Sequence, residues 1–89
     1  MNGKHIKVFG RVQVVGFRFF TAQLAKKYKI VGSVENVSDY VEIYASGNDD
    51  NLEQFINGVI QGAAPASVVE NYTIDDTTLD EKTKHFKTL

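Results

Sequence analysis

Residues 5–28 read HIKVFGRVQVVGFRFFTAQLAKKY, and within this stretch the spacing of the apolar residues changes from that of a strand to that of a helix. Ile6 and Val8 alternate with polar residues, which predicts a half-buried strand over about residues 5–11. Apolar residues then recur every three or four positions over residues 17–28, which predicts an amphipathic helix. The apolar stripe of this helix is expected to comprise Phe17, Phe20, Leu24 and Tyr28. The chain is therefore expected to begin with a strand, a short loop and a helix.

The same two patterns continue to the end of the chain. We expect further strands at about residues 30–36, 40–46 and 67–74, a second helix capped by Asn48 or Asp49, a polar tail over 75–84 and a short final strand near Phe86 and Leu89. The order β-α-β-β-α-β matches the split βαβ, ferredoxin-like plan, an α+β sandwich with an antiparallel sheet and two helices on one face. In this plan we expect the strand after the first helix to pair beside the first strand.

The bulk composition is that of an ordinary globular domain. The chain has 89 residues, which predicts one domain over residues 1–89, and it is 43% hydrophobic and 24% charged. It has no cysteine, which excludes disulfides, thiolate metal sites and a cysteine nucleophile. No apolar run has the length of a signal peptide or a membrane span, so we expect a cytoplasmic protein that binds no membrane. The net charge of −1 argues against nucleic acid as a partner.

The loop Gly10–Arg18 joins the first predicted strand to the first predicted helix, and its pattern suits an anion. Consecutive backbone N–H groups can form an anion-binding nest, and a helix N-terminus adds unpaired donors and a partial positive charge. Arg18, in the first helical turn, can reach back over the loop and bind a phosphate through two hydrogen bonds. The loop is not a P-loop, because no Gly-Lys-Ser/Thr follows. It predicts a cradle for a small phosphate dianion.

Each of these residues also has a simpler interpretation. A strand, loop and helix with two glycines is a common arrangement, and an arginine at the start of a helix is commonly a solvated side chain. Asn36 lies near the predicted turn after the second strand, where asparagine commonly makes local backbone hydrogen bonds. If that strand lies beside the first, Asn36 approaches the loop that Arg18 overlooks, and its amide can orient a water molecule. Spacing alone leaves both interpretations open.

The sequence of the loop also resembles a known family. GRVQVVGFR agrees with the acylphosphatase signature, Gly-Arg-Val-Gln-Gly-Val-Gly-Phe-Arg, at eight of nine positions. The resemblance continues through the predicted helix and through residues 32–37 and 41–47, and it resumes over residues 62–69. It therefore covers nearly the whole chain.

The resemblance implies an activity and a set of site residues. Acylphosphatases hydrolyse the carboxyl-phosphate bond of small acyl phosphates to a carboxylate and inorganic phosphate, without a metal, a cofactor or a covalent intermediate. The family's catalytic arginine corresponds to Arg18 and its catalytic asparagine to Asn36. Its phosphate-binding loop corresponds to the amides of Gln13, Val14, Val15, Gly16 and Phe17. Inorganic phosphate is then expected as product and competitor, and the enzyme is expected to be a monomer.

Two positions depart from the family's pattern. Val14 stands where the family usually has glycine, and a β-branched residue is costly if that position requires a positive φ. Strain of ~1–3 kcal/mol or a reshaped cradle would then weaken or abolish activity, whereas valine is tolerated if the φ is ordinary. The turn Val37–Tyr40 is one residue shorter than the common form with Asp-Gly, which should leave Asn36 in place.

No general acid or nucleophile is expected near the loop. We expect His5 in the first strand and His85 in the tail to be structural or exposed, and no histidine or carboxylate cluster predicts a metal site. Hydrolysis of an acyl phosphate does not require a general acid, because the leaving carboxylate, with a conjugate-acid pKa of about 4, departs without protonation. We therefore expect one in-line attack by water, in which Arg18 and the loop amides stabilise phosphoryl charge and Asn36 fixes the water.

Three alternatives compete with this interpretation. The first is an inactive or weakened acylphosphatase-like module that binds phosphate or a partner, which Val14 favours. The second is an RNA-binding ferredoxin-like domain in which Tyr40, Tyr44 and Tyr72 stack bases, although the chain lacks the aromatic RNA-binding motif and is not basic. The third is a fragment of a larger carbamoyl-phosphate-processing maturation protein. Against the third, the start and end of this short chain lead us to expect a free-standing protein.

Overall fold

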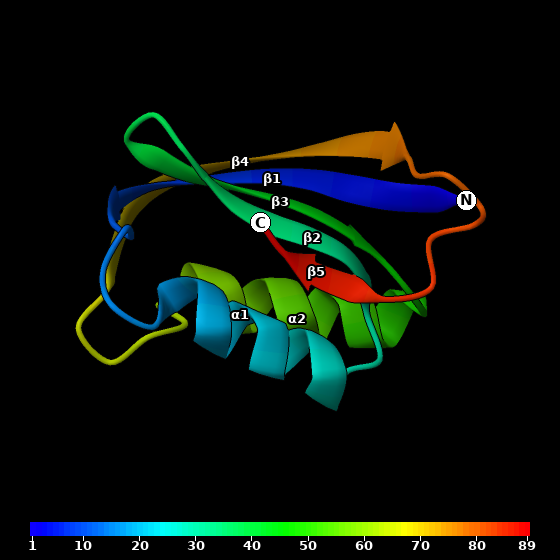
Figure 1. The fold of residues 1–89 in the computed structure, drawn as a ribbon, viewed down its shortest axis with the longest axis horizontal. Coiled ribbons are helices and arrows are strands. Elements are labelled where there is room, and N and C mark those ends of the chain that lie inside the picture. The colour runs from blue at the N-terminus through cyan, green and yellow to red at the C-terminus, as the bar shows by residue number, and fades with distance from the viewer.

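A computed structural model describes residues 1–89. Two helices lie on one face of a five-stranded sheet (Figure 1). The strands are β1 (Asn2–Arg11), β2 (Val31–Val37), β3 (Tyr40–Ser46), β4 (Val68–Thr78) and β5 (Phe86–Thr88), and the helices are α1 (Phe17–Lys27) and α2 (Asp49–Ile60). The expected α+β sandwich with both helices on one face is confirmed.

The strands are ordered β4-β1-β3-β2-β5 across the sheet. The first four are antiparallel to their neighbours as expected, whereas β5 pairs in parallel with β2 and makes the sheet mixed. The expectation that β2 pairs with β1 is wrong. β3 lies between them, with Ile43 opposite Ile6 on one side and Val34 on the other. The crossover through α1 leaves one strand position open, and the tight turn after β2 returns the chain into it.

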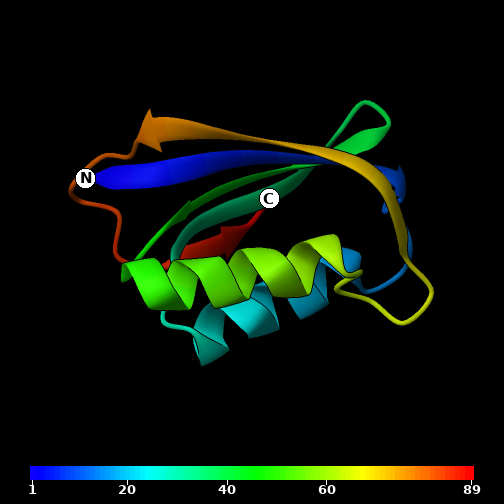
Figure 2. The same cartoon turned by 180° about the vertical axis from the view of Figure 1, so that it is seen from behind.

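The core lies between the sheet and the helices. Alternate residues of the central strands point toward the helices, as the two-residue period of a strand requires. Phe17 of α1 and Phe55 of α2 pack against them and are almost fully buried. Figure 2 shows from the opposite side that the two helices run next to each other beneath the sheet. The core is therefore one continuous cluster.

The buried stripe of α1 differs from the one expected. Its buried residues are Phe17, Thr21 and Ala25, which are spaced four apart, whereas Phe20 remains 39% exposed. Successive positions four apart stay on one face of a helix. The stripe that begins at Phe17 therefore faces the sheet and leaves Phe20 at its margin, beside the loop that precedes the helix.

The ends of two elements were also predicted incompletely. β4 continues to Thr78 instead of ending at Ile74, because β1 begins at Asn2 and its backbone pairs with Thr78. The side chains of this edge strand are mostly exposed, so its sequence shows no alternation of apolar and polar residues near Thr78. The expected cap of α2 is Asn48, whose side chain accepts hydrogen bonds from two backbone N–H groups of the first turn. Neither helix is long and apolar enough to cross a membrane.

Candidate active site

The loop begins at an irregularity in the first strand. The register between β1 and β4 shifts between Phe9 and Gly10, and Gly10 adopts a φ of 125°. A Cβ atom at Gly10 would lie 2.4 Å from the backbone oxygen of Val68, so only glycine fits. The chain leaves the sheet after Arg11 and crosses to α1, which places the loop at one end of the sandwich (Figure 1).

The N-terminus of α1 presents unpaired backbone donors. Gly16 precedes the helix with a φ of 90° and supplies no side-chain cap. The N–H groups of Val14, Val15, Gly16 and Arg18 donate to no carbonyl in the chain. The N–H of Phe17, by contrast, donates to the carbonyl of Val14 at 3.2 Å. Several adjacent free N–H groups at a helix start are suited to bind an anion.

Val14 fits this loop without backbone strain. Lys29 and Ser38 are the only non-glycine residues with a positive φ, so Val14 has an ordinary backbone conformation. Its side chain is half-buried and packs against the hydrophobic core. The valine side chain therefore packs against the core at a position where the family usually has glycine. The backbone strain considered from the sequence is not present.

Arg18 lies in the first turn of α1 and is half-buried. Its Nη1 atom donates a hydrogen bond of 2.6 Å to the backbone oxygen of Leu89. Leu89 is in turn held by its own N–H, which donates to Val34 of β2 at 2.9 Å. α1 packs over β2 and β5, so the end of β5 meets the start of the helix. Sequence reasoning predicted Arg18 and the final strand but missed this contact between them.

Asn36 is brought to the same site by two features. It lies two residues after Val34 on β2, so both side chains point to the helix-covered side of the sheet. Gln13 in the loop donates its Nε2 hydrogens to the backbone oxygens of Ser38, at 2.9 Å, and Tyr40, at 2.8 Å. These bonds tie the loop to the turn after β2. Asn36 thus approaches the loop although β2 and β1 are not neighbours.

Arg18, Asn36 and most of the loop line one open cavity of about 540 Å³. It is lined by Gln13, Val14, Val15, Gly16, Arg18, Phe19, Ala22, Asn36 and Thr88. Every predicted site residue lines it except Phe17, whose side chain is buried in the core. Phe19, Ala22 and Thr88 are cavity residues that sequence reasoning missed, and the i, i+3 spacing of Phe19 and Ala22 was the available signal. Arg18 is the only ionisable residue in the lining, so the cavity offers charge and hydrogen bonds without an acid or base.

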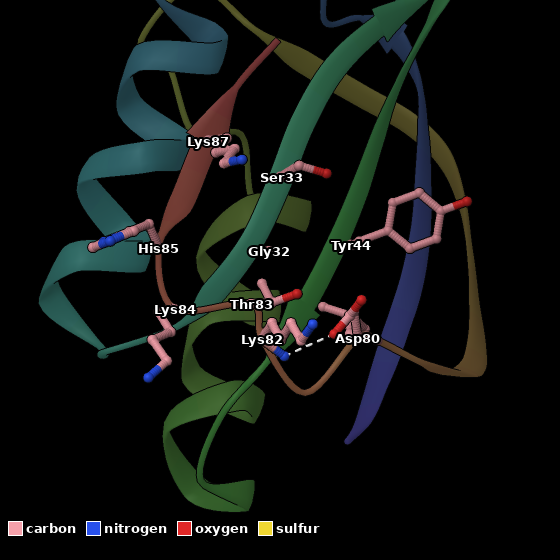
Figure 3. Close-up of a pocket in the computed structure, with 10 residues that line it drawn as sticks. Gly32, Ser33, Tyr44, Asp80, Lys82, Thr83, Lys84, His85 and Lys87 are labelled. Carbon is pink, nitrogen blue, oxygen red and sulfur yellow. Dashed lines mark hydrogen bonds between the residues drawn. The ribbon is translucent and has the colours of Figure 1, made fainter.

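A second hollow, of about 400 Å³, lies near the start of β2, away from its turn (Figure 3). Ser33 and Tyr44 form one side, and the segment between β4 and β5 forms the other. In that segment Lys82 donates its backbone N–H to the Asp80 carboxylate at 2.8 Å. His85 points toward α1, away from Ser33 and Tyr44 (Figure 3). None of the predicted site residues contributes to this hollow.

The tyrosines of the RNA-binding alternative do not form one surface. Tyr40 and Tyr44 lie on the face of the sheet that carries no helix, whereas Tyr72 is opposite Val8 and faces the helix side. Tyr44 is already stacked on His5, with ring centroids 4.4 Å apart. The His5 Nε2 atom also contacts a carboxylate of the same sheet face at 2.8 Å. His5 is therefore structural, as expected.

Comparison with known proteins connects this geometry to one family. The family model described as Acylphosphatase matches residues 4–88. An acylphosphatase of Staphylococcus haemolyticus (strain JCSC1435) is 58% identical over 89 residues, which cover 100% of both chains. An acylphosphatase of Staphylococcus aureus (strain Newman) is 53% identical with the same coverage.

Comparison with solved structures leads to the same family. The crystal structure of acylphosphatase from Bacillus subtilis aligns with a TM-score of 0.91 and 37% identity, over 100% of this chain and 99% of that one. Full-length HypF, in its phosphate- and nucleotide-bound form, aligns with a TM-score of 0.90 and 31% identity over 99% of this chain. That alignment covers 12% of HypF. The chain thus corresponds to a whole acylphosphatase relative and to a small part of HypF.

Proposed function

Because the chain belongs to the acylphosphatase family and hydrolyses the carboxyl-phosphate bond of acyl phosphates, we propose that Arg18 and Asn36 are its catalytic residues. The single observation that carries this proposal is that both side chains line one cavity with the free amides of the loop. The products are a carboxylate and inorganic phosphate. Inorganic phosphate is proposed to compete with the substrate, because it presents the same oxygens to the same donors.

The phosphoryl group is held by backbone donors and one guanidinium. The N–H groups of Val14, Val15 and Gly16 have no partner in the chain and are available to phosphoryl oxygens. Arg18 adds a positive charge and further donors next to them. The N–H of Phe17 is engaged with Val14, so Phe17 contributes by anchoring the helix start in the core. Gln13 contributes through its side chain, which fixes the loop against the turn after β2.

The attacking water is placed by Asn36. Its side-chain amide has both a donor and an acceptor, and it faces the loop from the end of β2. A water held there attacks phosphorus in line with the departing carboxylate, and the P–O bond to that carboxylate breaks as the new P–O bond forms. The carboxylate departs without a proton, since its conjugate acid has a pKa of about 4. Positioning and charge stabilisation are therefore sufficient, and no covalent intermediate is required.

The experiment that tests the arginine's role is steady-state hydrolysis of benzoyl phosphate with inorganic phosphate as competitor. Arg18→Ala is expected to lower kcat/KM by about 1,000-fold and to raise the Ki of phosphate, because both ligands lose the guanidinium. Lys27→Ala, which removes an exposed cation at the other end of α1, is the matched control and should keep the parental values. An Arg18→Ala variant with the parental kcat/KM would refute the assignment.

We further propose that residues 1–89 act as one catalytic domain, because a single hydrophobic cluster joins both helices to the sheet. The monomeric state, the cytoplasmic location and the lack of nucleic-acid or membrane partners stay predictions. Gel filtration at assay concentration tests the first of these most simply.

A further inference from the structure

Positive charge gathers at the end of α1 and in the segment that leads into β5. Residues 26–29 read KKYK and residues 82–87 read KTKHFK, and together they hold six of the ten lysines and arginines in the chain. Neither segment contains a carboxylate. The ion pairs of the structure involve Lys4, His5 and the N-terminus, so none of these six lysines is paired. This part of the molecule is therefore strongly positive, although the net charge of the chain is −1.

The two segments meet across a hollow of about 560 Å³ between α1 and the start of β5, which we call the α1–β5 hollow. The ionisable residues in its lining are Lys26, Lys29, Lys84 and His85, with no carboxylate among them. Lys84 and His85 point to the side on which α1 lies (Figure 3). The α1–β5 hollow has the size of a site for a small molecule, and cations border it from two elements.

Ordinary structural roles explain some of these lysines but not Lys29. Lys26 and Lys27 lie in the last turn of α1, where cations offset the helix dipole. Lysines beside an edge strand such as β5 hinder pairing with another chain. Lys29 follows the helix with a φ of 57°, a left-handed conformation in which glycine is favoured. A lysine there costs backbone stability, and what it adds is a positive charge in the lining of the α1–β5 hollow.

The cations of the α1–β5 hollow repel one another across the boundary between two elements. Lys26 and Lys29 belong to the end of α1 and Lys84 to the segment before β5. An anion bound between them contacts both sides and replaces repulsion with charge-assisted hydrogen bonds. One phosphate group carries a charge of roughly −1.5 to −2 at pH 7, which is less than three lysines can neutralise. The lining therefore matches an anion with more than one phosphate group.

We propose that the α1–β5 hollow is a second anion-binding site, for a small ligand that carries two or more phosphate groups. Inorganic polyphosphate and a nucleoside triphosphate share this chemistry. The site is separate from the active-site cavity, because Arg18 does not line it and Ala22 is the one residue that lines both. A concave site bordered from two elements suits a small ligand better than a flat membrane surface. Because the ligand bridges α1 and the segment before β5, its binding stabilises the fold.

The test is calorimetric titration of sodium tripolyphosphate into Arg18→Ala, which removes the guanidinium proposed to bind phosphate in the active-site cavity. We expect this variant to bind one tripolyphosphate per chain. In the same background, Lys29→Gly and Lys84→Gln should each raise the Kd by about fivefold, and together by about tenfold or more. Lys27→Gln is the matched control, because Lys27 lies outside the hollow and its Nζ is 5.3 Å from the ring centre of Tyr28. It should change the Kd by less than about twofold.

Lys29→Gly also separates binding from folding, because its two expected effects have opposite signs. Without ligand, glycine relieves the left-handed conformation, so the variant should melt at the parental temperature or above it. Tripolyphosphate at about ten times its Kd should raise the melting temperature of the Arg18→Ala protein by about 5 °C. The same concentration should raise the melting temperature of the protein with both substitutions by less than half as much.

Titration of ATP without a divalent cation distinguishes the two sources of the ligand. Tighter binding of ATP than of tripolyphosphate identifies a nucleotide, and weaker binding identifies inorganic polyphosphate. Loss of tripolyphosphate binding in a folded Arg18→Ala protein would overturn the second site, and so would equal weakening by Lys27→Gln and Lys84→Gln. Sedimentation with vesicles of anionic phospholipid, by a chain that binds no tripolyphosphate, would also overturn it.

Discussion

The Nη1 atom of Arg18 donates a hydrogen bond of 2.6 Å to the backbone oxygen of Leu89. Leu89 follows β5 and is fixed to the sheet because its N–H donates to the Val34 oxygen. The guanidinium that we place on the substrate phosphate is therefore oriented by the strand that pairs in parallel with β2. The fifth strand thus belongs to the proposed active site as well as to the sheet.

This contact predicts that Leu89 acts through its main chain. Deletion of Leu89 removes both the oxygen that orients Arg18 and the N–H that holds it to Val34, whereas Leu89→Ala keeps both. We expect the deletion to raise the Ki of inorganic phosphate by about tenfold, because the guanidinium is no longer pre-oriented and must be ordered when phosphate binds. Leu89→Ala should stay within about twofold of the parent in a competition assay. If the two variants behave alike, the backbone oxygen does not orient Arg18.

Gln13 predicts a second positioning effect. Gln13→Ala removes two hydrogen bonds that tie the loop to the carbonyls of Ser38 and Tyr40. We expect kcat for benzoyl phosphate to fall by about tenfold, since the loop and Asn36 are no longer held together, and stability to fall by about 1–2 kcal/mol. Gln23→Ala, an exposed glutamine of α1, is the control and should change neither. A parental kcat in Gln13→Ala would show that the bridge does not matter for catalysis.

Val14 yields a prediction opposite to that of the inactive-module alternative. The residue has an ordinary φ and packs against the core, so Val14→Gly loses contacts and gains backbone freedom. We expect the variant to be less stable by about 1–2 kcal/mol in urea unfolding and no faster on benzoyl phosphate. A gain of about tenfold or more in kcat would mean that valine does distort the cradle.

The composition of the cavity predicts insensitivity to pH and to chelators. Arg18 is the only ionisable side chain in its lining, and arginine stays cationic throughout the physiological range. We expect kcat to vary by less than about twofold between about pH 6.5 and 8.5, because the departing carboxylate of the substrate needs no proton donor. The lining also has no carboxylate or imidazole for a metal ion, so prior treatment with EDTA should leave kcat unchanged. A bell-shaped profile or a loss of activity with EDTA would point to groups outside this cavity.

The local patterns of the sequence predicted the element order, the position of Arg18 at a helix start and Asn36 near a turn. They failed where distant segments meet. The placement of β3 between β1 and β2 depends on which strands pair, and the contact of Arg18 with Leu89 depends on the parallel pairing of β5, neither of which has a local signal. The loop's resemblance to a family signature supplied catalytic roles that spacing alone left open. It did not reveal that the Phe17 N–H is already engaged or that Phe19 forms a wall of the cavity.

The role of Asn36 is the most direct test of the account, because that residue is assigned to the water and not to the phosphate. The measurement is kcat for benzoyl phosphate, together with the Ki of inorganic phosphate, in Asn36→Ala. The account predicts that kcat falls by about 100-fold or more while the Ki of phosphate stays within about twofold of the parent. An Asn36→Ala variant that keeps the parental kcat would contradict it.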